Sequence, residues 1–331
     1  MARFWKLITL LCLSTILSAN KIENPENITK VFGTSPPFTY LMYILNPDKM
    51  IGVNFRANNK DNNANKKFLK QSFLELPVLG SFHSGQGINI ETIIKYNPDL
   101  ILIWEDDSMP YLEKERIMRT KIPVILAPFR KIKSMPSSIQ LVAKAIGEDK
   151  RGELLSSYIN ERIDFLENLV KDVKKVTYYY AEGNDGLSTE CSDSFHTEAL
   201  NFAGGDNVHK CTQSSMSGME KITFEKLVEY DPDVIVAQNK LIYKEIFSNP
   251  LWRHLKAVQN NRVLLVPNTP FNWIDRPPSF MRIMGAEWLA SNFYPELYKT
   301  DLNEQIKKFY KLFLYVDITD EDIKSILEGI E

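Results

Sequence analysis

INIETIIKYNPDLILIW, residues 88–104, is the stretch that decides the fold, because the chain contains a second version of it. The second version is ITFEKLVEYDPDVIVAQ, residues 222–238, and the two copies are identical at six of 17 positions. The identical residues include an early glutamate, Glu91 or Glu225, and a central Pro-Asp pair. A unit repeated once at this long spacing indicates two similar lobes, because a solenoid would repeat it at a shorter period.

Each copy predicts a short helix, a turn and a buried strand. Asn89 and Thr223 are N-cap residues by type, and the proline that follows ends each helix at the residue before it. The apolar runs LILIW and VIVAQ then match a parallel strand that is buried on both faces. Two lobes of this kind leave a cleft between them, and we expect a ligand site in that cleft.

The rest of the chain alternates strands and helices in the manner of doubly wound α/β lobes. We predict an N-terminal α/β lobe over residues 27–136 and a C-terminal α/β lobe with closing helices over residues 173–331. Between them, residues 137–172 carry apolar side chains at helical spacing, interrupted only near Gly147 and Gly152. This segment predicts a long helix, in one piece or two, that joins the lobes.

The first 20 residues predict export. Arg3 and Lys6 precede an apolar stretch, Leu7–Leu17, that is too short to span a bilayer, and small residues follow. Residues 1–20 therefore have the layout of a signal peptide, which in a bacterium predicts a periplasmic protein; an interfacial anchor that is never cleaved is the alternative. The chain of 331 residues is long enough for two domains, and its formal net charge of −2 argues against nucleic acid as a partner.

Two of the three cysteines, Cys191 and Cys211, lie beyond the signal peptide. In an oxidising compartment they would pair and close a loop of about 20 residues, worth roughly 3 kcal/mol in the loop-entropy model. Together with His196 and His209 they could instead form a zinc site, although their spacing fits no usual zinc motif.

With these features the chain resembles the substrate-binding proteins of ABC importers for metal chelates, the class III periplasmic binding proteins, whose two lobes are joined by a rigid helix. The resemblance covers nearly all of the chain after the signal peptide. It rests on the two Glu-x6-Pro-Asp units, on FHTEALNFAGGDNV at 195–208, on the long helix and on FNWIDRPPS at 271–279. It implies a monomer that captures a metal ion or metal chelate and delivers it to the dimeric permease of an inner-membrane importer.

Ligand-binding residues are predicted near the carboxyl ends of the strands, where parallel α/β sheets bind ligands. One histidine from each lobe, His83 in a Gly-rich loop and His196 at the start of a helix, would suit a metal or a metal complex, since imidazole is a common transition-metal ligand. Aromatic rings offer flat surface to a chelate, and arginines bind its anionic groups. For each residue, packing or a local ion pair is the alternative role. The predicted ligand-binding set is His83, His196, Arg130, Arg276, Trp104, Trp273 and Tyr179, with His83 and His196 as metal ligands.

Glu91 and Glu225 occupy the first turn of equivalent predicted helices, where a carboxylate complements the helix dipole. In the family that the chain resembles, one such glutamate on each lobe pairs with arginines of the permease. The resemblance therefore implies that these two residues dock the protein onto its importer.

The sequence lacks the common catalytic signatures, including G-x-S-x-G, H-E-x-x-H and the phosphate-binding P-loop. We therefore predict a binding protein without a catalytic cofactor; an exported metalloenzyme on the same two-lobed scaffold is the alternative. Cleft histidines with few carboxylates favour a nickel or iron complex as cargo, because a bare hard cation prefers oxygen ligands.

Overall fold

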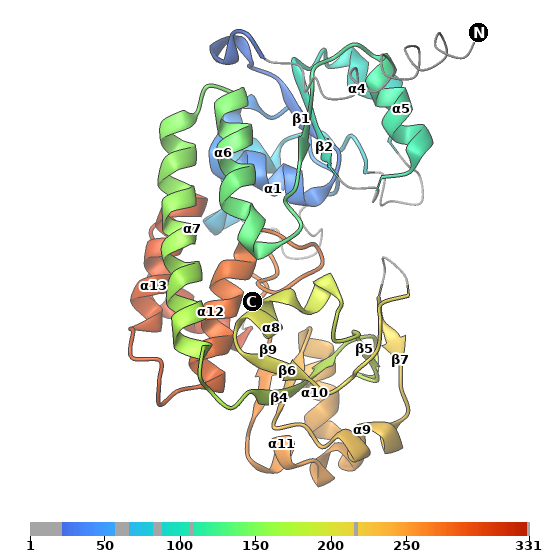
Figure 1. Ribbon diagram of the computed structural model, residues 1–331, viewed down its shortest axis with the longest axis vertical. Coiled ribbons are helices and arrows are strands. Elements are labelled where there is room, and N and C mark those ends of the chain that lie inside the picture. Colours follow the sequence, from blue (N-terminus) through green and yellow to red (C-terminus); the bar gives the residue numbers. More distant parts are fainter. Residues whose placement is uncertain (1–21, 57–65, 82–87, 106–108, 215–217, 330–331) are drawn as a thin grey trace, which may run out of the picture.

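The computed structural model describes residues 22–56, 66–81, 88–105, 109–214 and 218–329. Two lobes lie one above the other in Figure 1, and α7 (Asp149–Val170) runs along one side of both. Each lobe is built on a parallel β-sheet, as the repeat predicted. The two copies form equivalent parts of the lobes: α4 (Ile90–Lys95) leads into β2 (Leu100–Trp104), and α9 (Phe224–Tyr230) leads into β8 (Val234–Ala237).

The N-terminal lobe has a three-stranded sheet of order β1–β2–β3, with the repeat strand in the middle. Val31 of β1 pairs with Leu100, and Ile101 pairs with Val124 of β3, all in parallel register. The other elements of this lobe are β1 (Val31–Gly33), β3 (Val124–Ala127), α1 (Pro36–Leu45), α3 (Gln71–Leu74), α5 (Tyr111–Arg119), α6 (Met135–Ala145) and the 3-10 turns Pro25–Asn27, Pro47–Lys49 and Ile132–Ser134.

The C-terminal lobe has a four-stranded parallel sheet of order β6–β4–β8–β9, with its repeat strand again inside. A two-stranded antiparallel ribbon of β5 and β7 lies outside this sheet. The strands are β4 (Val176–Ala181), β5 (Ser188–Thr189), β6 (Gly205–Asn207), β7 (Glu220–Lys221) and β9 (Val263–Leu265). The helices are α8 (Glu198–Phe202), α10 (Lys240–Ser248), α11 (Lys256–Gln259), α12 (Met281–Phe293), α13 (Leu302–Phe309), the π-helix η6 (Tyr310–Leu314) and α14 (Asp320–Glu328), with 3-10 turns at Phe195–Thr197 and Pro250–His254.

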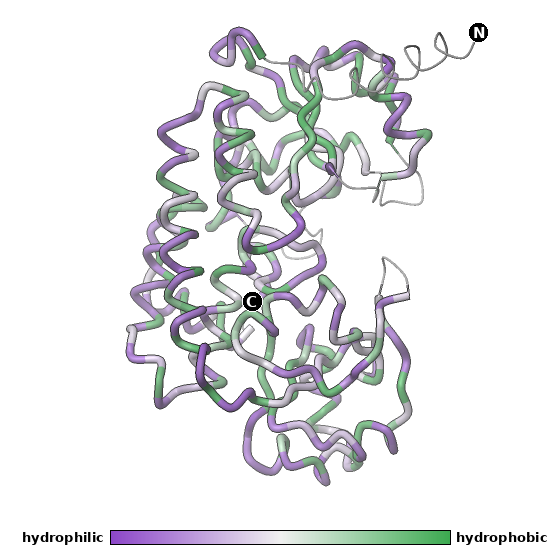
Figure 2. The backbone as a smooth tube through the Cα atoms, in the orientation of Figure 1, coloured by the Kyte–Doolittle hydropathy of each residue, from purple (hydrophilic) through white to green (hydrophobic). Residues whose placement is uncertain are grey.

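The repeat strands are buried on both faces, because successive side chains of a strand point to opposite sides. Leu100 and Leu102 of β2 belong to the large core that contains α1 and α6, whereas Ile101 and Ile103 pack in a smaller core with α4 and α5. The residues of β8 divide in the same way between the large core and a third one. Figure 2 shows β1 and β2 mostly hydrophobic, while α7 alternates between hydrophobic and hydrophilic residues.

The Pro-Asp pair of each repeat copy has a structural role. Oδ2 of Asp99 accepts hydrogen bonds from the backbone N–H groups of Thr29 and Lys30 at 2.8 and 2.9 Å, just before β1. Oδ2 of Asp233 accepts from the backbone N and the hydroxyl of Thr177, in β4, at 3.0 and 2.7 Å. Each aspartate therefore ties the start of the repeat strand to its neighbour, which helps to fix the register of the sheet.

The expected long helix over residues 137–172 is two helices, and the single-helix interpretation is wrong. α6 ends at Ala145 and α7 begins at Asp149, because Gly147 between them has a φ of 72°, the left-handed conformation that ends helices. The two helices pack closely at Gly152 of α7, where a Cβ would overlap the side chain of Ala143. Of these two helices, it is α7 that runs along both lobes (Figure 1).

Two arginines tie α7 to its neighbours. Arg151 donates hydrogen bonds to the carbonyl oxygens of Ile44 in α1, at 2.9 Å, and of Leu312 in η6, at 2.5 Å. Arg162 forms a buried bidentate ion pair with Glu287 of α12 at 2.8 and 3.1 Å. Removing one partner of such a pair is strongly destabilising. The lobes are thus connected by packed, hydrogen-bonded helices.

The predicted signal peptide, residues 1–20, lies outside the described residues. Within the described part of the chain, no helix combines the length and the apolar character that a membrane crossing needs.

Candidate functional site in the cleft between the lobes

A cleft of about 480 Å³ is lined by residues of both lobes. Its walls come from the carboxyl ends of strands and from the loops after them, as expected for parallel sheets. Trp104 is the last residue of β2, Arg130 follows β3, and His196 lies in the 3-10 turn before α8. The lining residues are Pro36, Pro37, Tyr40, Phe55, Trp104, Arg130, Phe195, His196, Arg276, Pro277 and Pro278.

Arg130 lies between aromatic side chains of the two lobes. Its guanidinium carbon is 5.5 Å from the ring centroid of Trp104 in the N-terminal lobe and 4.9 Å from that of Phe195 in the C-terminal lobe. Both distances fall in the range of cation–π attraction. Trp104 also packs against Phe38, with ring centroids 4.8 Å apart. The cleft therefore presents a cation flanked by flat apolar surfaces.

Arg276 brings a second cation to the cleft, and buried carboxylates hold it in place. Its Nε donates to Oε1 of Glu182 at 2.8 Å and lies 3.8 Å from Oδ2 of Asp275, and its Nη2 donates to Oε1 of Glu190. The carboxylate side chains are fully buried, whereas 23% of the Arg276 side chain is exposed. Burial acts to lower the pKa of Arg276, but the surrounding carboxylates raise it by more, so this group remains a cation.

The backbone of Arg276 has a φ of 56°, in the left-handed region. A non-glycine residue pays roughly 1–2 kcal/mol for this conformation. The ion pairs with Glu182 and Glu190 offset that cost, since they fix the side chain of the same residue. Strain at a residue that faces a cleft is typical of functional positions.

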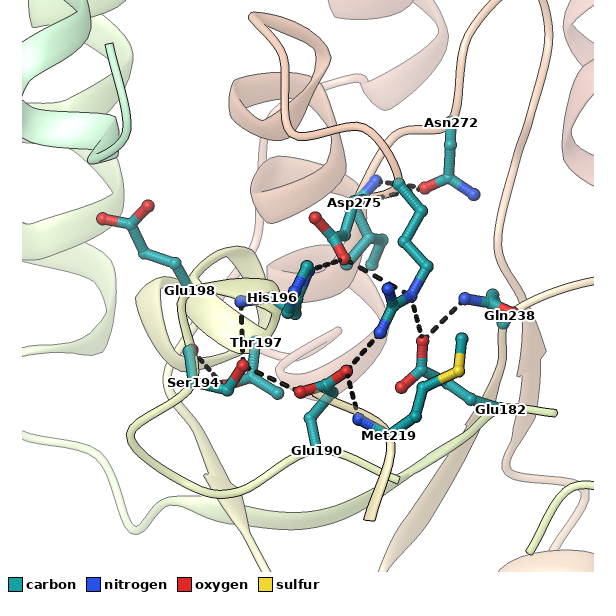
Figure 3. Close-up of polar contacts among 12 residues, drawn as sticks. Glu182, Glu190, Ser194, His196, Thr197, Glu198, Met219, Gln238, Asn272 and Asp275 are labelled. Atoms are coloured by element: carbon teal, nitrogen blue, oxygen red, sulfur yellow. Dashed lines mark hydrogen bonds and ion pairs between the residues drawn. The ribbon is translucent and has the colours of Figure 1, made fainter. Parts of the chain in front are cut away.

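Glu182 has a raised pKa chiefly because its carboxyl group is buried. Its Oε1 accepts from Gln238 at 2.6 Å as well as from Arg276 (Figure 3). Burial raises the pKa of Glu182 to about 8 against the lowering effect of Arg276, and the charges of Glu190 and Asp275 add to the rise. At neutral pH this group is mostly protonated, and the carboxylate cluster is less negative than its composition suggests.

His196 is oriented by a buried aspartate. Its Nδ1 is hydrogen bonded to Oδ2 of Asp275, and Figure 3 shows the imidazole pointing toward that carboxylate. Oδ1 of Asn272 accepts the backbone N–H of Asp275 at 2.9 Å and so fixes the loop that carries this aspartate. Burial acts to lower the pKa of His196, but the hydrogen bond and charge of Asp275 outweigh it, and the net pKa is raised.

The structure brings four of the predicted ligand-binding residues together: Trp104, Arg130, His196 and Arg276 all line the cleft. His83, predicted as a metal ligand, lies outside the described residues.

The prediction is corrected for Trp273 and Tyr179, which are both fully buried and do not line the cleft. Trp273 packs near Tyr310 in the large core, because its loop turns that side chain inward. Tyr179 points from β4 into the third core, where its hydroxyl donates to the carbonyl of Gly186 at 2.9 Å.

Sequence reasoning assigned no role to the buried carboxylates that hold Arg276. The carboxyl-end rule does place two of them on the cleft side: Glu182, which directly follows the strand Val176–Ala181, and Asp275, in the same loop as Arg276. Glu190 carries no such signal, because it lies in an irregular segment without periodicity. The aromatic residues Tyr40, Phe55 and Phe195 were also missed.

Cys191 and Cys211 form a disulfide, as predicted, with Cα atoms 4.8 Å apart. His209 lies beside them, and its Nδ1 contacts the hydroxyl of Tyr230 at 2.8 Å. The zinc interpretation is therefore wrong for this structure, since the sulfur atoms are bonded to each other and His196 is paired with Asp275 instead.

Glu91 and Glu225 are each the second residue of their helix, and both are exposed. The N-caps of these helices are made by the side chains of Asn89 and Thr223, which accept backbone N–H groups at 2.9 and 3.2 Å. Both glutamates are exposed at equivalent positions of the two lobes, and the Glu225 carboxylate also accepts hydrogen bonds from its own backbone N–H and from the Thr223 side chain, which lowers its pKa. Docking remains a prediction for both.

Comparison with known proteins agrees with this architecture. The ABC transporter solute binding protein from Sulfurospirillum deleyianum DSM 6946 is 39% identical and superposes with a TM-score of 0.88, over 92% of this chain and 95% of that one. The vitamin B12-binding protein of Vibrio parahaemolyticus is 22% identical over 58% of this chain and 67% of its own length. The high-affinity heme uptake system protein IsdE of Staphylococcus aureus is 24% identical over 62% of this chain and 71% of its own length.

The family model described as periplasmic binding protein matches residues 47–270, which is well over half of the chain. The sequence resemblance, the two parallel-sheet lobes and the cleft between them agree with this match. The chain therefore belongs to the periplasmic binding protein family and has its class III, two-lobed fold.

Proposed function

We propose that the protein captures an anionic metal chelate in the periplasm and delivers it to an ABC importer of the inner membrane. The observation that carries the proposal is the pair of arginines, Arg130 and Arg276, set among aromatic rings and prolines in one cleft. Guanidinium groups bind carboxylates through charge-assisted hydrogen bonds, and flat rings pack against an organic shell. The cleft volume of about 480 Å³ lies within the usual range of small-ligand sites.

A chelate suits this cleft better than a bare metal ion. Of the histidine, cysteine and acidic residues that the structure describes, only Cys191, His209 and Cys211 gather as a possible metal-ligand group, and its two sulfurs form the disulfide. The carboxylates near the cleft are buried and bound to Arg276. A metal that enters this cleft would therefore bring most of its ligands with it.

We favour a nickel or iron complex as the cargo. His196 lines the cleft and offers the imidazole group that suits these metals. The Vibrio and Staphylococcus relatives are named for vitamin B12 and for heme uptake, and both of these are metal chelates. These names support the class of cargo, while the two arginines support a chelate with negative charge.

Delivery requires contact with the permease, and we propose that Glu91 and Glu225 provide it. The two carboxylates are exposed at equivalent positions of the two repeat copies, one on each lobe. A monomer with two equivalent charges fits a dimeric permease, because each subunit can bind one of them. Such exposed ion pairs are weak singly, about 0.2–1 kcal/mol each, so the pair acts together.

Calorimetric titration with defined complexes tests the cargo. We expect ferric citrate or nickel citrate, both anionic, to bind more tightly than cyanocobalamin or nickel bis-histidine, which are uncharged, and bare Ni²⁺ to bind weakly. Tight binding of bare Ni²⁺, or binding of none of these complexes, would contradict the proposal.

The rival function is an exported metalloenzyme on the same scaffold. Native mass spectrometry of protein purified from cells, combined with metal analysis, separates the two functions. Release of one intact chelate per chain supports a receptor, whereas a retained metal together with turnover of a substrate would support the enzyme.

A further inference from the structure

The Cys191–Cys211 disulfide lies next to the residues that build one side of the cleft. Cys191 directly follows Glu190, the buried carboxylate that accepts from Arg276. Four and five residues after Cys191, Phe195 and His196 line the cleft. The disulfide is therefore close in the chain to three residues of the site.

The chain beyond Cys211 returns to the same carboxylate. The backbone N–H of Met219 donates to Oε1 of Glu190 at 3.0 Å, and a Cβ at Gly218, whose φ is 57°, would overlap the carboxylate. Glu190 is thus enclosed between its own segment and a segment that the disulfide joins to it. On its other oxygen it accepts from the hydroxyl of Ser194 at 2.8 Å.

We infer that Glu190 is a positioning residue for Arg276, and that the Cys191–Cys211 disulfide sets cargo affinity by keeping Glu190 in place. This inference rests on the proposed function, in which Arg276 binds the anionic part of the cargo. Glu190 does not line the cleft, and it acts only through the guanidinium that does.

The physical reason is the balance of charge around Arg276. With Glu190 in place, Nη2 is bound to one carboxylate and Nε to another, so the guanidinium is held in a fixed orientation. The β5–β7 pairing beside Glu190 also joins the two segments, so loss of the cross-link loosens them rather than freeing them, and water can then reach the buried carboxylate. Arg276 would lose its hydrogen bond to Glu190 while its contacts with Glu182 and Asp275 stay, and its orientation toward the cargo would change.

The cross-link can be removed chemically. A dithiol reductant transfers two electrons and two protons, so that the S–S bond becomes two thiols and the dithiol leaves as its own cyclic disulfide. Reduced Cys191 and Cys211 would, however, lie beside His209 as a possible metal-ligand set. The main test therefore uses the double variant Cys191→Ala and Cys211→Ala, which has no thiols to bind the metal of the probe.

The test compares binding of ferric citrate and nickel citrate by the oxidised wild type, the double-alanine variant, Glu190→Gln and the triple variant. We expect the double-alanine variant and Glu190→Gln each to weaken binding about tenfold, the effect of losing one charged hydrogen bond. The triple variant combines both cysteine substitutions with Glu190→Gln. It should bind the citrate complexes no more weakly than either of the other two variants, because the disulfide acts through Glu190. Ile246→Ala, in the buried core of α10, is the matched control that lowers stability and leaves affinity unchanged.

A second measurement does not need cargo. The Nε–H signal of Arg276 in a proton–nitrogen spectrum, identified by its loss in Arg276→Lys, should be sharp in the oxidised wild type. It should broaden or vanish in the double-alanine variant and after reduction of the wild type by dithiothreitol, and return on reoxidation.

The outcomes separate this inference from the proposed function. If the oxidised wild type binds no citrate complex, the proposed function fails, and this inference fails with it. If the wild type binds but the double-alanine variant binds equally well, or its effect adds to that of Glu190→Gln, only this inference is overturned. An unchanged Arg276 signal in the double-alanine variant would overturn it as well.

Discussion

Nε of Arg276 donates a hydrogen bond to Oε1 of Glu182 at 2.8 Å, and this contact joins the loop before α12 to the end of β4, 94 residues earlier in the chain. The contact makes the cleft cation part of the buried structure of the C-terminal lobe. Binding and stability are therefore coupled at this residue, and substitutions here should change both.

Arg276→Gln should lower both cargo affinity and stability. The substitution leaves the buried Glu190 carboxylate without its cation and Glu182 without a hydrogen-bond donor, and removing one partner of a buried pair costs about 3–5 kcal/mol. Chemical denaturation and titration with ferric citrate measure the two effects. Arg276→Lys is the control: it keeps the charge but cannot bond both carboxylates in the same geometry, so it should lie between wild type and Arg276→Gln. Full affinity in Arg276→Gln would exclude this residue from the site.

Stability should fall as the pH rises from about 4.5 to about 8. Glu182 keeps its proton in the folded protein up to a pKa of about 8 but loses it near 4.5 when unfolded, so rising pH favours the unfolded state through this window. His196, with a raised pKa, acts in the same direction, since its contribution is present below its unfolded pKa and is lost as the pH rises through its folded pKa. Carboxyl groups with a lowered pKa, such as that of Asp233, change the stability only at acid pH.

Glu182→Gln tests this pH dependence, because the amide keeps the shape of the side chain and cannot titrate. Denaturation curves at pH 5.5, 6.5 and 7.5 should show a fall in the wild type of at most about 1.4 kcal/mol per pH unit for each titrating group. The variant should show a flatter profile. Equal slopes for the two proteins would mean that Glu182 is already ionised at neutral pH.

Phe55 and Trp273 should show opposite effects when each is replaced by alanine. Phe55 lines the cleft and is 49% exposed, so Phe55→Ala should weaken binding of the chelate while changing stability by less than about 0.5 kcal/mol. Trp273 is fully buried, so Trp273→Ala should cost about 3–5 kcal/mol of stability and, where the variant is folded, leave affinity nearly unchanged. Loss of cargo by folded Trp273→Ala would restore the sequence-based prediction for this residue.

Replacing Glu91 and Glu225 together by alanine should leave cargo affinity intact, because both residues are exposed at the first turns of α4 and α9 and neither lines the cleft. Binding to the permease in liposomes should weaken, and the remaining binding should depend less on salt, since the screened ion pairs are gone. Single substitutions serve as controls, with about half of the effect each. Import at the wild-type level by the double variant would contradict the docking role. The two glutamates would then only complement the dipoles of their helices.

Cargo binding should change the overall shape little. α7 joins the lobes as one continuous helix, and Arg151 and Arg162 tie it to α1, η6 and α12. Large closure would have to break these contacts or bend the helix, which would break main-chain hydrogen bonds. Small-angle scattering with and without ferric citrate checks this, and a large compaction on binding would show that the connection is a hinge.

The sequence by itself determined the two-lobed architecture and much of the cleft. The repeated unit predicted one parallel sheet in each lobe, because the continuous apolar run that follows Pro-Asp needs burial on both faces. The carboxyl-end rule then placed Trp104, Arg130 and Arg276 on the cleft side, where the structure has them, since strand direction alone decides which end of a sheet a residue reaches. The disulfide was predicted from the oxidising compartment and from the two cysteines that lie beyond the signal peptide.

Only the tertiary structure decided which way the loop residues face and which charges meet. Trp273 and Arg276 are three residues apart, yet one is fully buried and the other reaches the cleft. An irregular loop has no periodicity from which orientation can be read, so its side chains are placed by contacts with distant segments. His196 meets Asp275 across 79 residues of sequence, and Glu190 meets Arg276 across 86. Such pairs form because a buried charge needs a partner, and the fold alone determines which partner is within reach.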